Sequence, residues 1–563
     1  MYRTHNCGEL NIEDINKKVI LSGWIHKIRK MKKYYFIDLR DYYGITQLII
    51  KKKKIKKIYN EYLIKIKGIV YKRLKKNKLI KTGEIEVHVY KIFIINKSKF
   101  LPFNIEDNPK INKKIRLKYR YLDLRRNEIK NNLIKKFKII NNIRNFFLKE
   151  KFIELDTPFL VNNTSEGARN FIIPSRNNKG FFYSLPQSPQ IFKQLLMIGG
   201  FDKYFQIVKC FRDEDFRKDR QPEFTQLDIE MSFINKNNIF LLIEKLIKYL
   251  IKKFYYQKII NFKKISYKES IKYYNTDKPD FRYKIYNIKL KNKFFKKKYI
   301  KYSKIIFIIP NFLNIKNIKI NKIKILINFF LKKFFFFYLT LKKEKVKKII
   351  KKKKYIKNII NKLFFSEYDS LIIILYKKKL NFNYKLFIKK INNFLLYSIY
   401  TKNILIPIWI INFPLFKYNF KKKKINSFHH PFTSPKKKIS KKNLFKIKSK
   451  AYDLIINGIE IGSGSIRINN KKLQEKIFYL LKIKKKDIYK KFGFFLNSLE
   501  YGTPPHGGIG IGIERLILLI LNKNDIRDLI PFPKSYNNKD IMLNTPSKIE
   551  NKKLLKLNIK IIN

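Results

Sequence analysis

Three short segments combine residue types that bind phosphate, divalent cations and carboxylates. The first covers residues 211–230, FRDEDFRKDRQPEFTQLDIE, in which arginines and acids alternate between two apolar stretches. Charges beside apolar strands need partners, because removing them from water is costly. A solvated loop of surface ion pairs is the simple interpretation of such a run. The order of the residues is too specific for that interpretation, so we assign the segment to a ligand site.

The other two segments are rich in glycine. Residues 460–467 read EIGSGSIR, with Asp453 seven residues before Glu460, and two carboxylates of this kind can share Mg²⁺ with nucleotide phosphates. Residues 507–515 read GGIGIGIER, a glycine-rich strand that would bring backbone and one arginine to a phosphate. Nine of the 18 glycines lie between Gly458 and Gly512, which indicates a close backbone approach to a ligand. A dinucleotide fingerprint is excluded because no βαβ unit with a distal acid surrounds the glycines.

The elements that must position these segments can be predicted from the pattern of apolar residues. Strands over 204–211 and 223–233 would enter and leave the first segment. Apolar residues at three- to four-residue spacing predict a helix over 127–150, and a strand over 152–155 follows it. Strands and helices of this kind occupy two parts of the chain, 104–282 and 406–545, on either side of a segment of different character.

Residues 1–103 predict a separate small β-barrel. Five β-rich runs, 19–25, 34–39, 45–50, 63–70 and 84–95, match the size of an OB-fold. Its basic and aromatic residues could stack bases and neutralise phosphate, although core aromatics and solvated lysines explain any single residue equally well. Residues 283–405 contain only three acids and several low-complexity runs, so we interpret them as an inserted domain. Residues 546–563 form a lysine-rich tail.

The overall charge indicates a polyanionic partner without identifying it. Lys and Arg number 129 against 41 Asp and Glu, a formal net charge of +88. Nucleic acid and an anionic membrane surface both fit this excess, and so does a genome biased towards A- and T-rich codons. Two cysteines, Cys7 and Cys210, favour a reducing compartment, and no apolar stretch reaches ~18 residues. We expect a soluble, cytoplasmic chain that does not enter a membrane.

Together the segments resemble the three motifs of class II aminoacyl-tRNA synthetases. Residues 152–158 resemble motif 1, residues 211–214 motif 2, and residues 510–515 motif 3. The bacterial-type aspartyl-tRNA synthetases are the most similar branch. The stretches that carry this resemblance are RLKYRYLDLRR at 116–126, LPQSPQ at 185–190, the run 212–228, HHPFTSP at 429–435 and YGTPPH at 501–506. The branch has an extra domain at the position of residues 283–405.

The resemblance implies an α+β fold, in which residues 104–282 and 406–545 form a catalytic domain with an antiparallel sheet flanked by helices. It also implies a two-step aspartate–tRNA ligase. Aspartate would attack the α-phosphate of ATP, and the tRNA would then accept the aspartyl group at its 3′ end. It also implies the site residues. The aspartate-binding residues would be Glu166, Gln190, Lys193, Arg212, Asp228, His429 and Arg467. The ATP-binding residues would be Arg212, Asp213, Glu214, Gln221, Phe224, Glu460, Gly512, Ile513, Glu514 and Arg515. Asp453 and Glu460 would hold Mg²⁺.

The remaining implications concern partners and specificity. Lys193 and Arg467 would select aspartate, because asparagine would leave a buried cationic pair without its anion. Arg29, Phe36 and Gln47 of the OB-fold would contact the anticodon, and Pro158 would lie at a homodimer interface. The enzyme could charge tRNA(Asp) alone or tRNA(Asn) as well. A synthetase-like paralogue that binds tRNA without activating an amino acid is the more remote alternative.

Overall fold

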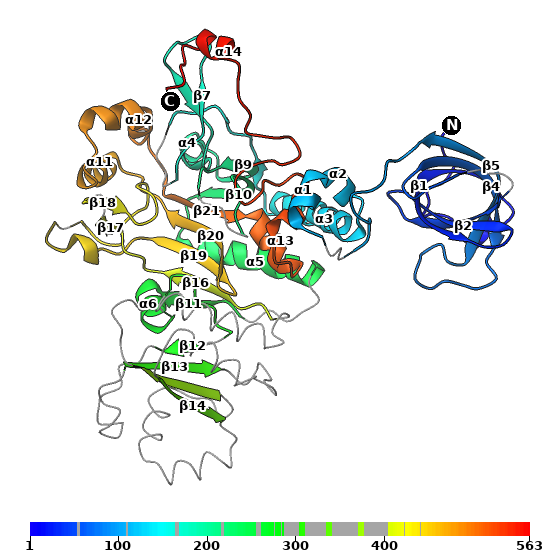
Figure 1. The fold of residues 1–563 in the computed structure, drawn as a ribbon. Helices are drawn as coiled ribbons and strands as arrows, with labels where there is room; N and C mark the ends of the chain where they lie inside the picture. Colours follow the sequence, from blue (N-terminus) through cyan, green and yellow to red (C-terminus); the bar gives the residue numbers. More distant parts are fainter. Residues whose placement is uncertain are drawn as a thin grey trace. The chain divides into compact units, whose positions relative to one another are not determined.

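The structure is a computed structural model that forms two compact units, Met1–Ile111 and Asn112–Asn563 (Figure 1). It describes residues 1–52, 57–107, 111–163, 168–214, 219–254, 261–274, 276–282, 284–286, 303–309, 334–340, 370–376, 404–420, 423–439 and 441–562. The boundary between the units lies eight residues beyond the one that we expected at 103.

The first unit is a closed five-stranded barrel with the strand order β1-β2-β3-β5-β4. Its strands are β1 (Lys18–Lys30), β2 (Tyr34–Arg40), β3 (Ile45–Lys51), β4 (Leu63–Lys72) and β5 (Ile85–Asn96), after a short 3-10 helix, η1 (Ile12–Asp14). All neighbours pair antiparallel except β3 and β5. The five predicted strands and the OB-fold are confirmed.

Alternation along the strands produces the barrel's interior. Over the first eight residues of β1 and of β4 every second residue is buried, because successive side chains point to opposite faces of a strand. Isoleucine, leucine and valine fill the inside, including Leu21, Ile37, Leu48 and Ile66, all fully buried. β-Branched residues suit this role because they pack well on a pleated surface.

The second unit contains an eight-stranded sheet with the order β11-β16-β19-β20-β21-β10-β9-β6. The strands are β6 (Ile153–Glu154), β9 (Lys203–Phe211), β10 (Glu223–Ser232), β11 (Lys263–Ser266), β16 (Pro407–Ile411), β19 (Ala451–Ile456), β20 (Ile459–Ile466) and β21 (His506–Gly512). The six central strands are antiparallel as expected. Both edge strands, β6 and β11, pair parallel with their neighbours, so the sheet is mixed. Each reaches its neighbour by a long crossover, which parallel pairing requires.

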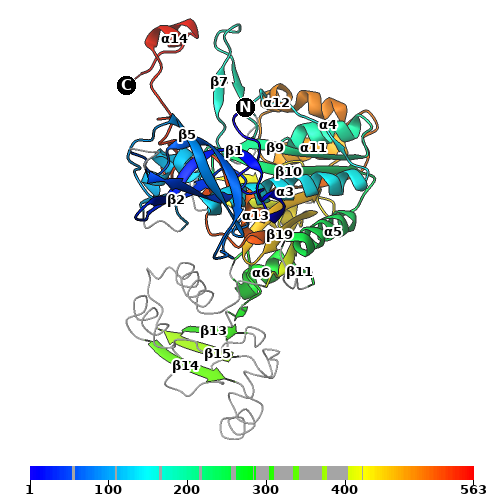
Figure 2. The same cartoon turned by 90° about the vertical axis from the view of Figure 1, so that its right-hand side faces the viewer.

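Helices cover the two faces of this sheet (Figures 1 and 2). On one face, α3 (Asn127–Lys149), α5 (Lys236–Phe254) and α13 (Ile513–Ile520) bury apolar side chains against the strands. α4 (Gln190–Ile198), α11 (Lys471–Leu480) and α12 (Lys485–Ser498) pack on one another in a separate cluster. The predicted helix at 127–150 is therefore present and ends one residue earlier.

Smaller elements complete the chain. The helices are α1 (Lys113–Lys118), α2 (Arg120–Asp123), α6 (Tyr267–Tyr274) and α14 (Asn551–Lys556), with 3-10 turns η6 (Lys441–Lys446) and η7 (Ile526–Leu529). Two hairpins are formed by β7 (Ile172–Pro174) with β8 (Phe182–Ser184), and β17 (Phe416–Asn419) with β18 (Lys424–Ser427). Within the expected insertion, the described residues form a four-stranded sheet, β12-β13-β15-β14. Its strands are β12 (Lys284–Tyr286), β13 (Ser303–Ile309), β14 (Phe334–Thr340) and β15 (Ser370–Tyr376), and the rest of 283–403 lies outside the described residues.

Candidate active site

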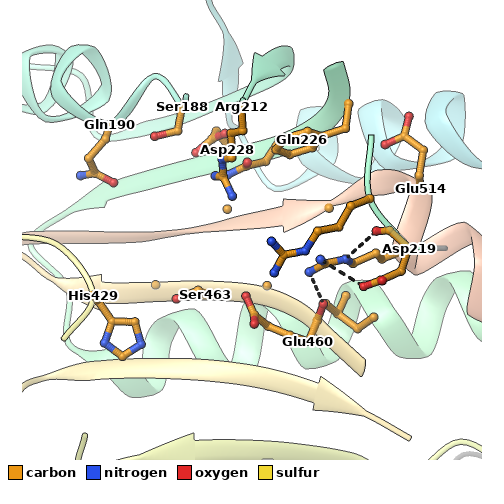
Figure 3. Close-up of a pocket in the computed structure, with 18 of the residues that line it drawn as sticks. Ser188, Gln190, Arg212, Asp219, Gln226, Asp228, His429, Glu460, Ser463 and Glu514 are labelled. Carbon is orange, nitrogen blue, oxygen red and sulfur yellow. Dashed lines mark hydrogen bonds and ion pairs between the residues drawn. The ribbon is translucent and has the colours of Figure 1, made fainter. Parts of the chain in front are cut away.

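A cavity of about 320 Å³ lies on the face of the sheet opposite α5 and α13 (Figure 3). Strands β10, β20 and β21 supply its floor, and α4 and the loop of residues 428–435 supply one wall. Figure 3 shows Gln190 and His429 at one end, and Asp219, Glu460 and Glu514 at the other. The two ends therefore differ in the residues that they present.

The glycines of β21 create room for the polar side chains of β10. In the pairing of these strands, Gln226 lies opposite Gly512, Asp228 opposite Gly510 and Glu230 opposite Gly508. A Cβ atom on Gly510 would overlap the Gln226 amide, and one on Gly508 would overlap Glu230 and the backbone of Ile229. The intervening residues of β10 point into the core on the other face. The glycine cluster is thus a floor of bare backbone.

Two buried cations share two buried carboxylates at the end of the cavity that carries Gln190 and His429. Lys193 Nζ donates to Asp228 Oδ1 at 2.8 Å and lies 3.3 Å from Glu230 Oε2. Arg467 donates from Nε and Nη2 to the two oxygens of Glu230 at 2.8 and 3.0 Å. All four side chains are at most 2% exposed. Opposite charges satisfy one another here, as buried charges require.

The surroundings of this cluster keep its charges in place. Burial alone would raise the pKa of Glu230, but the nearby Arg467 and Lys193 outweigh burial and hold this pKa below its ordinary value. His430 is half-buried, and the loss of contact with water, followed by the charge of Arg467, lowers its pKa well below 6.5. Arg467 Nη1 lies 2.6 Å from His430 Nε2, so a neutral imidazole accepts a hydrogen bond from the guanidinium.

Four buried polar atoms on the cavity wall have no hydrogen-bond partner among the described residues. They are Gln190 Nε2, Arg212 Nε, Asp228 Oδ2 and His429 Nδ1. Buried polar atoms are almost always paired, because leaving one unpaired costs about 1–3 kcal/mol. An acceptor and two donors of this kind are arranged for a ligand with both an ammonium group and a carboxylate.

Two arginines line the cavity: Arg212 from the segment that resembles motif 2 and Arg515 from the segment that resembles motif 3. The Arg212 guanidinium lies 5.0 Å from the centre of the Phe224 ring, which holds it over the cavity. Arg515 donates from Nη1 to the Glu460 carbonyl at 3.1 Å, and its Nη2 lies 3.3 Å from Asp219. Two fixed cations beside one cavity are suited to neutralising phosphate charge.

The other predicted ATP-binding residues take several positions. Glu214 pairs with Arg220, and Gln221 is anchored by two hydrogen bonds with the backbone of Lys534; both line the cavity, as does Gly512. Glu514 also borders the cavity and binds Lys136 and the Thr225 amide. Two predicted residues do not line it. Asp213 pairs with Arg169, and Ile513 is fully buried in the core.

A β-bulge places the two predicted magnesium ligands on the same face of the sheet. Asp453 of β19 pairs with Ser463 of β20, and Ile455 pairs with Glu460, so Ile461 is an extra residue in β20. In a regular strand, residues 460 and 463 would point to opposite faces. The bulge turns Ile461 into the core and leaves Glu460 on the face of Asp453. The spacing of seven residues therefore works only with this irregularity.

Asp453 and Glu460 meet only part of what a hard cation such as Mg²⁺ requires. Asp453 Oδ1 is buried and accepts no hydrogen bond, with His429 Nε2 3.3 Å away. Glu460 Oε2 lies 2.5 Å from Lys278 Nζ. Carboxylate oxygens are the ligands that Mg²⁺ prefers, usually one or two together with substrate phosphates. No group of three His, Cys, Asp or Glu side chains that could hold a metal occurs among the described residues.

The remaining predicted residues lie away from the cavity or cannot be placed. Glu166 lies outside the described residues. Pro158 is exposed, beside the exposed apolar side chains of Phe159 and Leu160. In the barrel, the register puts Arg29 opposite Phe36, and Arg29 donates to Gln47 Oε1 at 3.0 Å, so the three predicted anticodon residues lie together.

Sequence reasoning missed several residues of the site. Glu230, His430, Ser463 and Lys278 were not assigned, although the first three line or support the cavity. Glu230 could have been found, because it lies two residues after Asp228 in a strand and must point the same way. Lys278 lies far from Glu460 in sequence, and no pattern links them.

No helix within the described part of the chain has both the length and the apolar character needed to span a bilayer.

Comparison with known proteins agrees with this architecture. The model for class II tRNA synthetases (D, K and N) matches residues 112–536, and that for the OB-fold nucleic acid binding domain matches residues 19–95. An "Aspartate--tRNA(Asp/Asn) ligase" of Dictyoglomus turgidum is 43% identical, over 100% of this chain and 98% of that protein. An "Aspartate--tRNA ligase" of Mycoplasma mycoides is 41% identical, over the full length of both.

Solved structures of low identity share the fold. Asparaginyl-tRNA synthetase from Pyrococcus horikoshii, complexed with asparaginyl-adenylate, has a TM-score of 0.60 at 19% identity and covers 95% of this chain and 99% of that one. A structure of this similarity supports the architecture alone. With both family models matched in order and full-length relatives above 40% identity, the chain belongs to the class II tRNA synthetases of the D, K and N group.

Proposed function

We propose that the chain is an aspartate–tRNA ligase. The α-carboxylate of aspartate attacks the α-phosphorus of ATP, and pyrophosphate leaves to give aspartyl-adenylate. A hydroxyl of the 3′-terminal adenosine of tRNA(Asp) then attacks the acyl carbon, and AMP leaves. Neither step needs a protein nucleophile, so positioning and charge neutralisation by the enzyme carry the catalysis.

The four unpaired polar atoms of the cavity wall are the observation that carries this proposal. Asp228 Oδ2 can accept from the ammonium group of the amino acid, while Gln190 Nε2 and Arg212 Nε can donate to its carboxylates. Lys193 and Arg467 stand in the same wall and supply the positive charge that an aspartate side chain requires. The N–H groups of Lys193 and Arg467 that remain beyond their bonds to Asp228 and Glu230 can donate to both oxygens of an aspartate side chain, whereas the amide nitrogen of asparagine can only donate.

The other end of the cavity is assigned to ATP. Arg212 and Arg515 flank the phosphates, Phe224 stacks on the adenine, and Gln221 and Glu214 bind the nucleotide. Asp453 and Glu460 would hold Mg²⁺, which would supply positive charge beside the phosphates. The shared face of these two carboxylates and the unbonded oxygen of Asp453 support this assignment.

The OB-fold is assigned to the anticodon. Arg29 and Phe36 offer a cation and an aromatic ring side by side on the barrel, a combination suited to single-stranded bases, and the buried Gln47 accepts a hydrogen bond from Arg29 and so orients it. Since a relative carries the name "Aspartate--tRNA(Asp/Asn) ligase", charging of tRNA(Asn) is the second candidate activity. An enzyme that charges tRNA(Asp) alone would require the barrel to reject one anticodon base, and an enzyme that also charges tRNA(Asn) would accept that base.

A homodimer completes the proposal. Pro158 stands in an exposed strip with Ile153, Phe159 and Leu160, whose exposed fractions are 49%, 44% and 54% for the three apolar side chains. Burying such a strip against a second copy would remove apolar surface from water. Sedimentation of the full chain with Phe159 and Leu160 changed to Asp should give monomers where the unmodified chain gives dimers.

Isotope exchange between ATP and pyrophosphate tests the activity directly. The full-length chain should exchange label with aspartate and remain at background with asparagine or lysine. Background exchange with aspartate would refute the proposal. Charging of purified tRNA(Asp) and tRNA(Asn) by the same preparation then separates the two candidate activities.

A further inference from the structure

Lys278 reaches the active site from the loop that leads into the inserted sheet. This loop, residues 276–282, connects α6 with β12. The Lys278 amide donates to Thr276 Oγ1 at 3.1 Å, and Ser270 Oγ of α6 donates to the Thr276 carbonyl at 2.6 Å. These bonds hold the backbone of Lys278 close to the end of α6.

A second contact docks the same loop on the turn between β19 and β20. Asp280 is 3% exposed and binds Arg282 through both carboxylate oxygens. Its Cβ lies 3.3 Å from the position that a Cβ on Gly458 would occupy. The loop is therefore packed against the hairpin that carries Asp453 and Glu460.

The Lys278 ammonium group lies on the carboxylate of Glu460. Nζ is 2.5 Å from Oε2, and the two side chains are 35% and 28% exposed. Burial would raise the pKa of Glu460, but Lys278 and, less strongly, Arg515 hold it below its ordinary value. Arg515 contacts the main chain of the same residue, so two cations converge on it from different elements.

This contact is incompatible with the role proposed for Glu460 in the loaded site. An ammonium group and a divalent cation on one carboxylate oxygen repel each other strongly at such a short distance. Lysine is a point charge on a flexible stem, and it can swing to a new anion without moving its backbone. The anions that enter this end of the cavity with the substrate are the phosphates of ATP.

We propose that Lys278 is a substrate-binding residue that pairs with Glu460 in the empty site and with the phosphates of ATP in the loaded site. This inference rests on the proposed function, because it takes ATP as the ligand of that end of the cavity. It assigns to the root of the inserted domain a direct part in nucleotide binding. In the empty site, the contact with Lys278 holds the Glu460 carboxylate in place.

The proposed move of Lys278 from Glu460 to the phosphates of ATP predicts opposite effects of a substitution on metal binding and on nucleotide binding. Lys278→Met keeps the length of the side chain and removes its charge. In full-length enzyme without ATP, Mn²⁺ binding followed by electron paramagnetic resonance should tighten about tenfold or more, because the competing cation is gone. The affinity for ATP in the presence of Mg²⁺, measured by calorimetry, should weaken about tenfold.

Two variants control the experiment. Lys272→Met removes an exposed charge from α6 on the same connection and should alter neither affinity. Lys278→Arg keeps a cation and should restore most of the ATP affinity. Effects of the same sign in Lys278→Met, or no change in either affinity, overturn the inference. Aspartate-dependent ATP–pyrophosphate exchange by the unmodified enzyme is measured separately. Its absence would refute the proposed function, whereas unchanged affinities in Lys278→Met would refute only the proposed role of Lys278.

Discussion

Glu230 accepts both hydrogen bonds that Arg467 donates along one edge of its guanidinium, at 2.8 and 3.0 Å. The same carboxylate lies 3.3 Å from Lys193 Nζ. One fully buried anion thus orients both cations assigned to aspartate recognition. It contacts the cavity only through them, which makes Glu230 a positioning residue.

Replacing Glu230 by Gln should destabilise the catalytic unit strongly. The two buried cations would lose their shared anion, and breaking a buried pair of this kind costs about 3–5 kcal/mol. Equilibrium unfolding in urea measures the loss. Glu154→Gln is the matched control, since it breaks an exposed two-oxygen contact with Arg144 and should cost under about 1 kcal/mol. Similar losses in the two variants would contradict the role of burial.

Changing Lys193 to Met should separate amino-acid binding from nucleotide binding. We expect the KM for aspartate to rise at least about 30-fold, because a buried charge contact with the substrate is lost. The KM for ATP should stay within about twofold. Pyrophosphate exchange at varied aspartate and ATP measures both constants, with Lys209→Met on the exposed face of β9 as control. An unchanged KM for aspartate would remove Lys193 from the substrate site.

Alanine at three of the four glycines of β21, namely Gly508, Gly510 and Gly512, should give a graded series. At Gly508 the added Cβ overlaps backbone, so the protein should lose stability or fail to fold. At Gly510 it displaces the Gln226 side chain, and exchange activity should fall with the fold retained. At Gly512 the nearest atoms are 3.8 Å away, so Gly512→Ala should resemble the unmodified chain. Thermal unfolding and exchange on each variant test the order.

Removing either cavity arginine should block adenylate formation and spare tRNA binding. Arg212→Ala and Arg515→Ala each remove a cation from the charge that develops at the phosphates, so exchange should fall at least about 100-fold. Affinity for tRNA(Asp), followed by filter binding, should change less than about threefold. Exchange near the unmodified rate would contradict the assigned roles.

Stability should fall as the pH drops below about 6.5, partly because of His430. Its folded pKa is depressed by burial and by Arg467, so the unfolded chain takes up a proton that the folded chain refuses. The contribution of His430 to the free energy of unfolding is complete above pH 6.5 and declines below that pH by at most about 1.4 kcal/mol per pH unit. Urea unfolding at pH 7.5 and 5.5 should show a smaller drop in His430→Gln. Equal drops in both proteins would show that His430 takes up its proton in the fold.

Regular patterns made most of the scaffold predictable. The five barrel strands and the helix at 127–150 follow from period-two and three- to four-residue spacing, and the structure reproduces them within a few residues. Clustered glycines correctly indicated a place of close backbone approach. The pattern did not show why glycine is required there. The reason is the strand register, which places Asp228 opposite Gly510.

Irregular and long-range features escaped prediction. The extra residue at Ile461 leaves no mark on composition, yet it decides which face Glu460 occupies. Contacts such as Lys278 with Glu460 join segments separated by the whole insertion, and a single sequence carries no signal for them. The parallel edge strands were missed for the same reason, because strand direction at an edge depends on the path of the crossover.

The bare-backbone floor also limits how far the composition of this chain can drift. A lysine-rich bias can change surface positions freely, since an exchanged side chain there meets water. At Gly508 and Gly510 every alternative residue adds atoms to space that neighbouring groups already fill. Mutational pressure that changes the rest of the chain therefore meets a steric barrier at these positions. The absence of a side chain at these two glycines thus preserves the shape of the cavity.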